Sequence, residues 1–360
     1  MERLSCILLS VITLVYCERN YGSSKDIVAP IRLTRAPLGS FVRDFVVFVT
    51  SHHNSHSWNL PLLFDTGSWE SWVLSDSVAM SRGDGLRAYI DGHGTARDFG
   101  PRTLTYGYGH SIQLDYALDE TISVGPKANA TIRLWISTKL SPAFGISFGS
   151  VGTLGAELSS DLARQIGMFT FIPRNGRMEM RFGPFKDREY CRTKAIQYTM
   201  IRRIGGSYDR WNVEGSIGVR SQIPRLISVP EKGVAMMTQM LMDTGMPGVE
   251  LFVPLFNAFA SIMLEIGSPI REMNGMFFAK NCGGYMHRFP VISLVIGTFS
   301  HYIRPRAYVV YRGSSECSLR IYRRETYQFI PQMVVGSNFL RYVISHWDVE
   351  NLRMGFCSIR

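Results

Sequence analysis

Alternating apolar and polar positions recur along this sequence and predict a protein built mainly of β-strands. In FVRDFVVFV, residues 41–49, the side chains of Phe45, Val47 and Val49 fall on one side of the chain. This is the two-residue period of a strand with a buried face. LTYGYGHSIQLDYALDETISV, residues 104–124, predicts two strands around a glycine-rich tip, and therefore a long hairpin.

Helical patterns are few and short. SSDLARQIGMF, residues 159–169, begins with Ser and Asp in capping positions. PLFNAFASIMLEIG, residues 254–267, spaces its apolar residues at helical intervals before a terminating glycine. Near the end of the chain, YVISHWDVENLRMGFCSI predicts a second hairpin, which turns at Glu350 and Asn351. The expected fold class is therefore mostly β with minor helix.

One pattern occurs twice. PLLFDTGSWESWVLS, residues 61–75, and QMLMDTGMPGVELFVP, residues 239–254, each place Asp-Thr-Gly directly after an apolar run and before another β-like segment. The two acids, Asp65 and Asp243, lie 178 residues apart in a chain of 360. Each half also carries a later apolar segment with glycine, FGISFGS in the first and MVVGSNFL in the second. A doubled unit predicts two similar lobes that face one another, with the functional site in the cleft between them.

Two carboxylates at the ends of buried strands indicate acid/base chemistry. A charged carboxylate is costly in a dry crevice, so two that lie close together must share a proton. One can then take a proton from a water molecule while the other donates its proton to a carbonyl oxygen, which hydrolyses an amide without a covalent intermediate. Asp-Thr-Gly is also an ordinary turn sequence, but two copies in the same setting make chance a poor explanation.

Composition narrows the class of protein. With 46% hydrophobic and 19% charged residues, the chain is suited to two globular lobes rather than to disorder. The formal net charge of +10 comes from basic residues that are scattered or paired and form no long run. Such charge usually covers solvated faces, so we expect no nucleic-acid partner.

The first residues have the pattern of a secretory signal peptide. Residues 1–17 combine Arg3 with an apolar stretch that is too short to span a bilayer. Its removal would leave four cysteines, an even number that fits an oxidising compartment. Asn129 begins the one glycosylation triplet of the chain. We therefore expect a protein that is secreted or in the lumen of the secretory pathway, with no stable membrane anchor.

At its two Asp-Thr-Gly motifs the sequence resembles the pepsin-like aspartic endopeptidases, and the likeness covers nearly all of the chain after about Pro37. The resemblance implies that Asp65 and Asp243 are the catalytic acids. It also implies that TYGYG is the tip of a flap, whose tyrosine Tyr106 closes over substrate and hydrogen-bonds toward Trp72. The residues that the resemblance assigns to substrate binding are Thr66, Gly67, Ser68, Trp72, Tyr106, Thr244 and Gly245.

The resemblance implies a bilobal, mostly β fold with the active-site cleft between the lobes. We assign residues 1–17 to the signal peptide and 18–37 to a short N-terminal or pro segment. The N-terminal lobe then spans 38–188 and the C-terminal lobe spans 189–360. The implied partners are polypeptide substrates, the enzyme is expected to be a monomer, and neither a cofactor nor a metal is expected.

Disulfide pairing is only partly implied. The resemblance pairs Cys282 with Cys317 in a loop of the second lobe. Cys191 and Cys357 either form a second bond, which would tie the start of that lobe to the final strand, or remain two buried thiols. The sequence leaves both alternatives open, because connectivity cannot be deduced from spacing.

One departure from the family concerns the second acid. The family places Ser or Thr directly after the second Asp-Thr-Gly, whereas this chain has Met246. A hydrogen bond to a charged group is worth about 1.5–3 kcal/mol, so we expect a raised pKa for Asp243 and an ionised Asp65 beside Ser68. The hypothesis is an active aspartic endopeptidase whose pH profile is displaced upward. Its rival is a catalytically weak or inactive relative that binds peptides in the cleft.

A histidine cluster offers a weaker alternative. His52 and His56 have a spacing that can bind metal on a helix, and His53 lies between them. The flanking residues have strand and loop patterns, so we expect a solvent-exposed hairpin turn at this position rather than a metal site.

Overall fold

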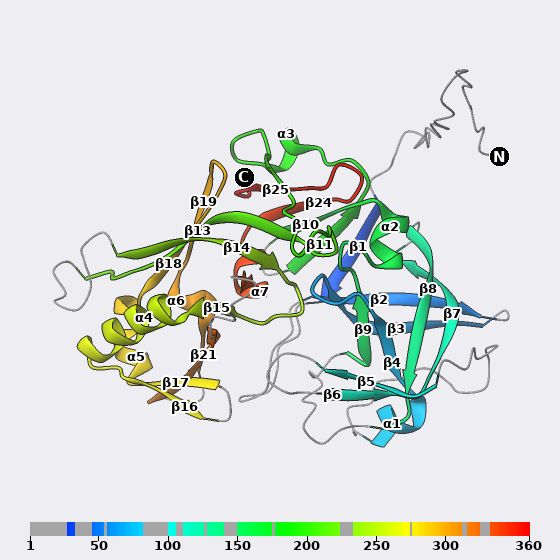
Figure 1. Cartoon of the computed structure of the whole chain (residues 1–360), viewed down its shortest axis with the longest axis horizontal. Helices are drawn as coiled ribbons and strands as arrows, with labels where there is room; N and C mark the ends of the chain where they lie inside the picture. The colour runs from blue at the N-terminus through cyan, green and yellow to red at the C-terminus, as the bar shows by residue number, and fades with distance from the viewer. Residues whose placement is uncertain are drawn as a thin grey trace.

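The computed structural model describes residues 27–32, 45–53, 56–81, 100–105, 111–125, 128–139, 150–174, 177–223, 233–273, 276–311, 315–324 and 332–360. Strands make up most of these residues, and they form two β lobes that lie side by side beneath a sheet that both share (Figure 1). The prediction of a mostly β, two-lobed protein is confirmed. The proposed signal peptide and residues 18–26 lie outside the described residues.

The first lobe is built from strands that form one half of a twelve-stranded sheet. The hairpin of β2 and β3 brings His53 opposite His56, so the histidine cluster lies in a hairpin, as expected. Phe45, Val47 and Val49 are fully buried, in agreement with the predicted alternation. The strands of this lobe are β2 (Val46–His53), β3 (His56–Asp65), β4 (Ser71–Leu74), β7 (Tyr116–Val124), β8 (Ala128–Ser137) and β9 (Gly152–Gly155).

The second lobe contains a seven-stranded sheet and a four-stranded sheet. The larger sheet has the order β19-β18-β13-β14-β23-β15-β22, and the smaller has the order β16-β17-β21-β20. The strands of the larger sheet are β13 (Asn212–Arg220), β14 (Val234–Met242), β15 (Val249–Phe252), β18 (Val291–Ile296), β19 (Phe299–Ile303), β22 (Ile321–Arg324) and β23 (Gln332–Val335). Those of the smaller are β16 (Ile270–Met273), β17 (Met276–Lys280), β20 (Val309–Tyr311) and β21 (Glu316–Leu319).

The same four-strand unit occurs in both lobes. In the first, β3 pairs in parallel with β9, β9 pairs antiparallel with β4, and β4 pairs in parallel with β8. In the second, β14, β23, β15 and β22 have the same sequence of pairings. Each Asp-Thr-Gly loop connects the first strand of its unit to the third. The internal repeat that the sequence predicts is therefore a structural repeat.

A shared layer joins the two lobes. β10 (Met168–Arg174) pairs on one side with β11 (Arg177–Phe182) and on the other with β24 (Ile344–Asp348). β24 and β25 (Arg353–Cys357) form the predicted C-terminal hairpin, and β12 (Gln197–Met200) pairs with β25. β1 (Ile27–Arg32) lies between β11 and β2, so this part of the predicted N-terminal segment is a strand of the shared sheet.

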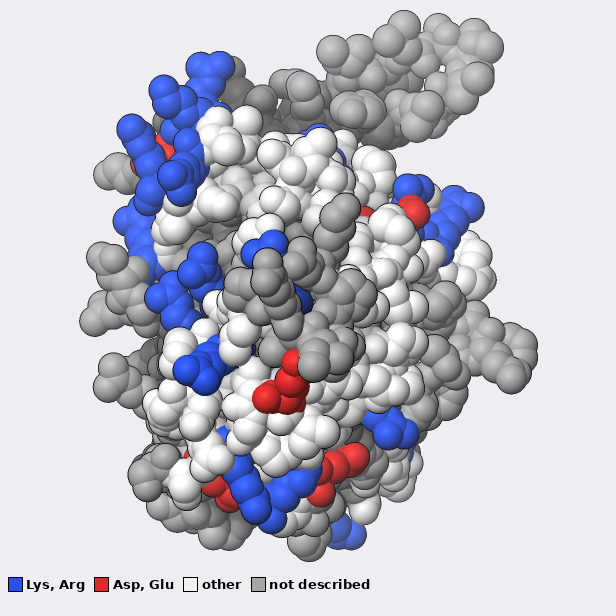
Figure 2. Space-filling model, turned by 90° about the vertical axis from the view of Figure 1, so that its left-hand side faces the viewer, with Lys and Arg blue, Asp and Glu red and all other residues white. Residues whose placement is uncertain are grey.

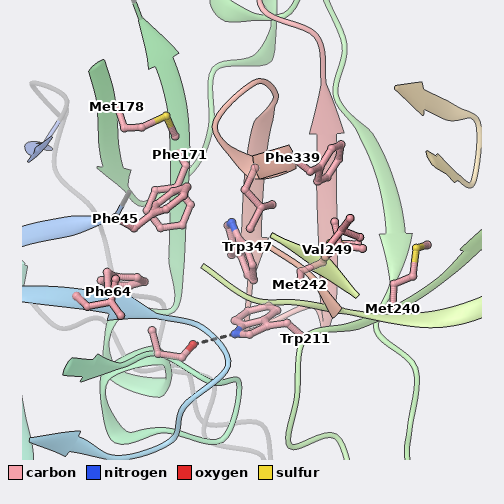
Figure 3. Packing of buried hydrophobic residues seen from close by; sticks show 14 of the residues in the cluster. Phe45, Phe64, Phe171, Met178, Trp211, Met240, Met242, Val249, Phe339 and Trp347 are labelled. Atoms are coloured by element: carbon pink, nitrogen blue, oxygen red, sulfur yellow. Dashed lines mark hydrogen bonds between the residues drawn. The ribbon is translucent and has the colours of Figure 1, made fainter. Parts of the chain in front are cut away.

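The hydrophobic core runs through this layer from one lobe to the other (Figure 3). Phe64 of the first lobe packs edge-on against Phe169, with 5.3 Å between ring centres. Phe169 stacks on Trp347 at 5.5 Å, and Trp347 meets the ring of Trp211 at 5.0 Å. Burial of aromatic rings contributes strongly to stability. Here the packed rings connect the two lobes beneath the Asp-Thr-Gly loops.

The helices are short and lie outside the sheets. In α2 (Asp161–Ile166), the Ser160 hydroxyl accepts a hydrogen bond from the Ala163 amide at 3.1 Å, which confirms the predicted cap. α4 (Val253–Glu265) has Pro254 in its first turn and is followed by Gly267 at a φ of +80°, so it ends at the predicted glycine. The remaining helices are α1 (Asp76–Ser81), α3 (Asp187–Tyr190), α5 (Cys282–Tyr285), α6 (Pro305–Tyr308), α7 (Ser337–Leu340) and the 3₁₀ turn Met286–Arg288.

Basic residues are spread over the face of the second lobe. Figure 2 shows Lys and Arg in several groups on that face, with Asp and Glu between some of them. Part of this charge is paired, since Arg202 lies 2.9 Å from Glu214 and Arg271 forms an ion pair with Glu316. Among the described residues, no helix has both the length and the hydropathy that crossing a membrane requires.

Candidate active site

The two Asp-Thr-Gly loops begin at corresponding positions in the two lobes. Asp65 is the last residue of β3, and Asp243 follows the last residue of β14. The Asp65 carbonyl oxygen accepts a hydrogen bond from Ala156 at 2.8 Å, and the Asp243 amide donates to Val335 at 3.0 Å. Each acid is therefore fixed by the strand that runs parallel to its own.

A glycine directly after or at the end of each parallel strand lets the chain pass close to its loop. A Cβ atom on Gly155 would lie 2.6 Å from the Glu70 carbonyl oxygen, and one on Gly336 would lie 2.1 Å from that of Met246. The sequence pattern pointed to FGISFGS, residues 144–150, for the first lobe. The structure assigns this position to Gly155 instead, while residues 144–149 lie outside the described residues.

Two threonines brace the loops against each other. The Thr66 amide donates to the Thr244 hydroxyl oxygen at 3.0 Å, and the Thr244 amide donates to the Thr66 hydroxyl oxygen at 3.0 Å. The Thr66 hydroxyl then donates to the Met242 carbonyl at 2.9 Å, and the Thr244 hydroxyl donates to the Phe64 carbonyl. Both threonines are buried. Because every bond crosses from one lobe to the other, the network fixes the two acids relative to one another.

The two carboxyl groups face each other across the loop glycines. A Cβ atom on Gly67 would lie 2.4 Å from the carboxyl carbon of Asp243, and one on Gly245 would lie 2.4 Å from that of Asp65. Only glycine leaves room for such an approach. Two carboxyl groups this close repel each other when both are charged, so their approach favours a state in which the pair holds one proton.

The hydrogen bonds to the two carboxyl groups differ. Asp65 accepts from the Gly67 amide at 2.9 Å and from the Ser68 hydroxyl at 2.8 Å, with one bond on each oxygen. Asp243 accepts from the amides of Gly245 at 2.8 Å and Met246 at 3.1 Å, and both bonds are on the same oxygen. The Met246 side chain points into an apolar cluster with Leu241, Tyr322 and Val334. The second loop therefore has no counterpart of the Ser68 hydroxyl bond.

The surroundings of Asp243 favour its protonated form. Removal from water raises the pKa of Asp243 well above its ordinary value, and the charge of Asp65 and the hydrogen bond between the two side chains raise it further. The amides of Gly245 and Met246 oppose this shift without cancelling it. The raised pKa of Asp243 therefore favours a state in which this side chain carries a proton.

The structure describes the two strands of the predicted flap, whereas residues 106–110 between them lie outside the described residues. β5 (Arg102–Thr105) pairs with β6 (Ser111–Leu114) as the expected antiparallel hairpin. The hairpin is shorter than predicted, because β7 pairs with β8 and β2 in the twelve-stranded sheet instead. Tyr106 lies outside the described residues, so its bond toward Trp72 stays a prediction. Trp72 itself is buried on β4, opposite Trp135 of β8. At the base of the hairpin, Arg102 forms an ion pair with Glu70 and lies 4.0 Å from the Trp135 ring centre, so the hairpin is held against the first loop.

One ion pair beside the loops was missed by the sequence patterns. Glu157 is 4% exposed and lies two residues after Gly155. Its carboxylate pairs at 3.0 Å with Arg210, which belongs to the other lobe. The one signal in the sequence is an acid that directly follows the apolar stretch VGTLGA. This pattern indicates that the Glu157 carboxylate is buried, but it does not indicate that Arg210 is its partner.

Both possible disulfides are formed. Cys282 pairs with Cys317, as the resemblance implies, and Cys191 pairs with Cys357. The second bond ties the segment after α3 to the last strand, β25, and settles the alternative that the sequence leaves open. Disulfides are typical of proteins that fold in an oxidising compartment.

Two further predictions concern metal binding and glycosylation. In the described residues, no three His, Cys, Asp or Glu side chains are grouped so that they could hold a metal ion. Asn129 is exposed on β8, and its side-chain oxygen accepts from the Ser123 hydroxyl at 2.6 Å. Its glycosylation stays a prediction.

One comparison with known proteins covers the second lobe. Residues 208–359 match the model of the family described as eukaryotic aspartyl protease. No curated protein matches the chain. The matched region contains the second Asp-Thr-Gly loop, all of the seven-stranded sheet and the C-terminal hairpin, and the first lobe repeats its four-strand unit. Over residues 208–359 the chain is thus similar to the eukaryotic aspartyl proteases, and its two lobes have the mostly β, pepsin-like architecture that the sequence implies.

Proposed function

We propose that this protein is an aspartic endopeptidase that hydrolyses peptide bonds with a water molecule activated between Asp65 and Asp243. The observation that carries the proposal is the pair of carboxyl groups that face each other across Gly67 and Gly245, on loops braced by Thr66 and Thr244. A carboxyl pair with one shared proton is the acid/base device of aspartic proteases.

The asymmetry of the hydrogen bonds supports a division of roles. Asp65, which accepts from the Gly67 amide and the Ser68 hydroxyl, is suited to be the carboxylate. Asp243, whose pKa is raised, is suited to carry the proton. Hydrogen bonds to a charged group favour the charged form, whereas burial favours the neutral one.

The reaction then proceeds in two steps. The Asp65 carboxylate takes a proton from water, the water oxygen bonds to the carbonyl carbon of the substrate, and Asp243 gives its proton to the carbonyl oxygen. A tetrahedral gem-diol forms. In the second step Asp65 gives its proton to the amide nitrogen, the C–N bond breaks, and Asp243 recovers a proton from the diol. The products are a carboxylic acid and an amine, and the pair returns to its starting protonation state.

The substrates and the location follow from the same proposal. Residues 208–359 match the eukaryotic aspartyl protease model, so we propose polypeptide substrates and cleavage between residues with apolar side chains. Tyr106, which directly follows β5 in the sequence, is proposed to close over the bound peptide beside Trp72. Two disulfides support a secreted protein or one in the lumen of the secretory pathway.

The test is cleavage of a quenched fluorescent peptide library from about pH 3 to pH 7.5. The wild type should cleave, and Asp65→Asn and Asp243→Asn should each lose the activity, because either change removes one member of the acid/base pair. Glu214→Gln, which removes an exposed carboxylate from β13, is the matched control and should keep it. The family's peptide inhibitors that mimic the tetrahedral state give a second readout.

The outcomes separate the proposal from its rival. Activity that survives in either Asp→Asn variant rules out a reaction at this pair. A folded wild type that cuts nothing, yet binds a peptide with a secondary alcohol in place of the scissile amide, is a peptide-binding relative rather than an enzyme.

A further inference from the structure

Behind the first loop lies a carboxylate that the proposed reaction does not use. Glu157 follows β9, and its amide donates to the Ser68 carbonyl oxygen at 3.0 Å. The neighbouring Ala156 amide donates to the Asp65 carbonyl oxygen at 2.8 Å. Residues 156 and 157 are thus bonded directly to the backbone of the loop that holds the first acid, and a change at Glu157 acts next to that acid.

The same segment is the place where the second lobe docks. The Trp211 indole N–H donates to the Ala156 carbonyl at 2.8 Å (Figure 3), and the Ser159 amide donates to the Asp209 carbonyl at 3.1 Å. Arg210, between these two residues, pairs with Glu157 at 3.0 Å. Three consecutive residues of one lobe therefore hold the short segment that supports Asp65 in the other.

The charges around Glu157 differ in sign and in exposure. The Glu157 side chain is 6% exposed, whereas that of Arg210 is 54% exposed and partly solvated. Burial raises the pKa of Glu157 to about 7; the Arg210 guanidinium lowers it, and the negative charges of Asp65 and Asp209 raise it. Glu157 therefore becomes charged near neutral pH, within electrostatic reach of the first acid.

We propose that Glu157 is a positioning residue for the hydrolysis: its carboxylate, held by Arg210 of the opposite lobe, stabilises the proton that Asp65 and Asp243 share. The inference rests on the proposed function. A negative charge beside the pair makes the loss of its last proton less favourable. The ion pair thus extends activity toward neutral pH, in addition to joining the lobes.

The first test is the basic limb of the kcat/KM profile, where the pair loses its shared proton. Glu157→Gln, which keeps the shape and removes the charge, should shift the midpoint of that limb to lower pH by about half a pH unit. Glu157→Asp keeps the charge and should leave the midpoint closer to that of the wild type. Glu214→Gln removes a carboxylate that pairs with Arg202 on the surface, and it should leave the limb in place. A purely structural role would lower kcat/KM at every pH without moving the midpoint.

A second test needs neither turnover nor a variant of Glu157. Coupling between two sites is reciprocal, so Asp65→Asn should shift the ionisation midpoint of Glu157 to lower pH by about half a pH unit. The midpoint can be followed by NMR of the ¹³C-labelled Glu157 carboxyl group in the full chain. Asp209→Asn is the comparison variant, because the same measurement should give a smaller shift for this exposed acid, whose effect on Glu157 is weaker than that of Asp65.

The two proposals fail in different ways. If the wild type cleaves but neither the basic limb nor the Glu157 midpoint moves, the inference about Glu157 is wrong and the peptidase stands. If nothing is cleaved but the Glu157 midpoint responds to Asp65→Asn, the coupling exists at a site that does not hydrolyse peptides. A Glu157 midpoint that stays in place in Asp65→Asn overturns the inference in every case.

Discussion

The two Asp-Thr-Gly loops are nearly the same in backbone and differ in one hydrogen bond. In each loop the carboxyl group of the aspartate faces the glycine of the other loop. The threonine of each loop also donates its amide to the hydroxyl oxygen of the other threonine. The first loop adds the Ser68 hydroxyl, whereas the second places Met246 in an apolar cluster. The repeat therefore sets the geometry of the pair, while the residue after each triplet makes the hydrogen bonding of the two carboxyl groups unequal.

The glycines give the strongest test of the shared geometry. Gly67→Ala and Gly245→Ala would each place a methyl group within 2.4 Å of the opposite carboxyl carbon. Since the neighbour is the reacting group itself, we expect each variant to lose at least about 100-fold in kcat/KM, or roughly 3 kcal/mol. Kinetics with the same peptide measure this loss. A loss in one variant only would contradict the symmetry.

The threonine bracing should give the next largest effect, mainly on stability. Thr66→Val removes the hydroxyl that bonds the Thr244 amide and the Met242 carbonyl, and Thr244→Val removes the one that bonds the Thr66 amide and the Phe64 carbonyl. Each buried unsatisfied group costs about 1–3 kcal/mol, so each variant should lower the free energy of unfolding by about 2–4 kcal/mol. Urea unfolding measures it. Because the residues share one network, the double variant should cost less than the sum.

The residue after each triplet should give the smallest effect, and the two loops should respond in opposite directions. Ser68→Ala removes the hydroxyl bond to Asp65 and should move the acid limb of kcat/KM to higher pH. Met246→Thr offers a hydroxyl to Asp243, which favours its charged form, lowers its raised pKa and should move the basic limb to lower pH. Each shift should be about one pH unit.

A control separates charge from packing in this comparison. Met246→Leu keeps the apolar contact with Tyr322 and Val334 and adds no hydroxyl. It should leave both limbs where they are in the wild type. If Met246→Thr leaves the basic limb unchanged as well, the missing hydroxyl does not explain the raised pKa of Asp243.

The sequence predicted the parts of the site that are encoded locally. An apolar run followed by Asp-Thr-Gly is visible in a short window, so both loops, the Ser160 cap and the C-terminal hairpin were predicted correctly. The bond between Cys191 and Cys357 and the pair of Glu157 and Arg210 depend on residues brought together by tertiary docking, which no local pattern encodes. The same reason explains why the sequence indicates FGISFGS for the first lobe and not the segment that ends at Gly155. Both stretches are apolar and contain glycine, and only the pairing of β9 with β3 distinguishes them.

The pairing of β10 with β24 also has a consequence for the order of events during synthesis. Thr170 of β10 bonds to His346 of β24, 176 residues later in the chain. At about 5–20 residues per second, translation needs roughly 10–35 seconds to supply that partner. Until then β10 presents an open edge, and Cys191 has no partner either, because Cys357 is made later still. The nascent first lobe therefore has to be protected from edge-to-edge association, and truncation by about a dozen C-terminal residues would remove β25 and the disulfide together.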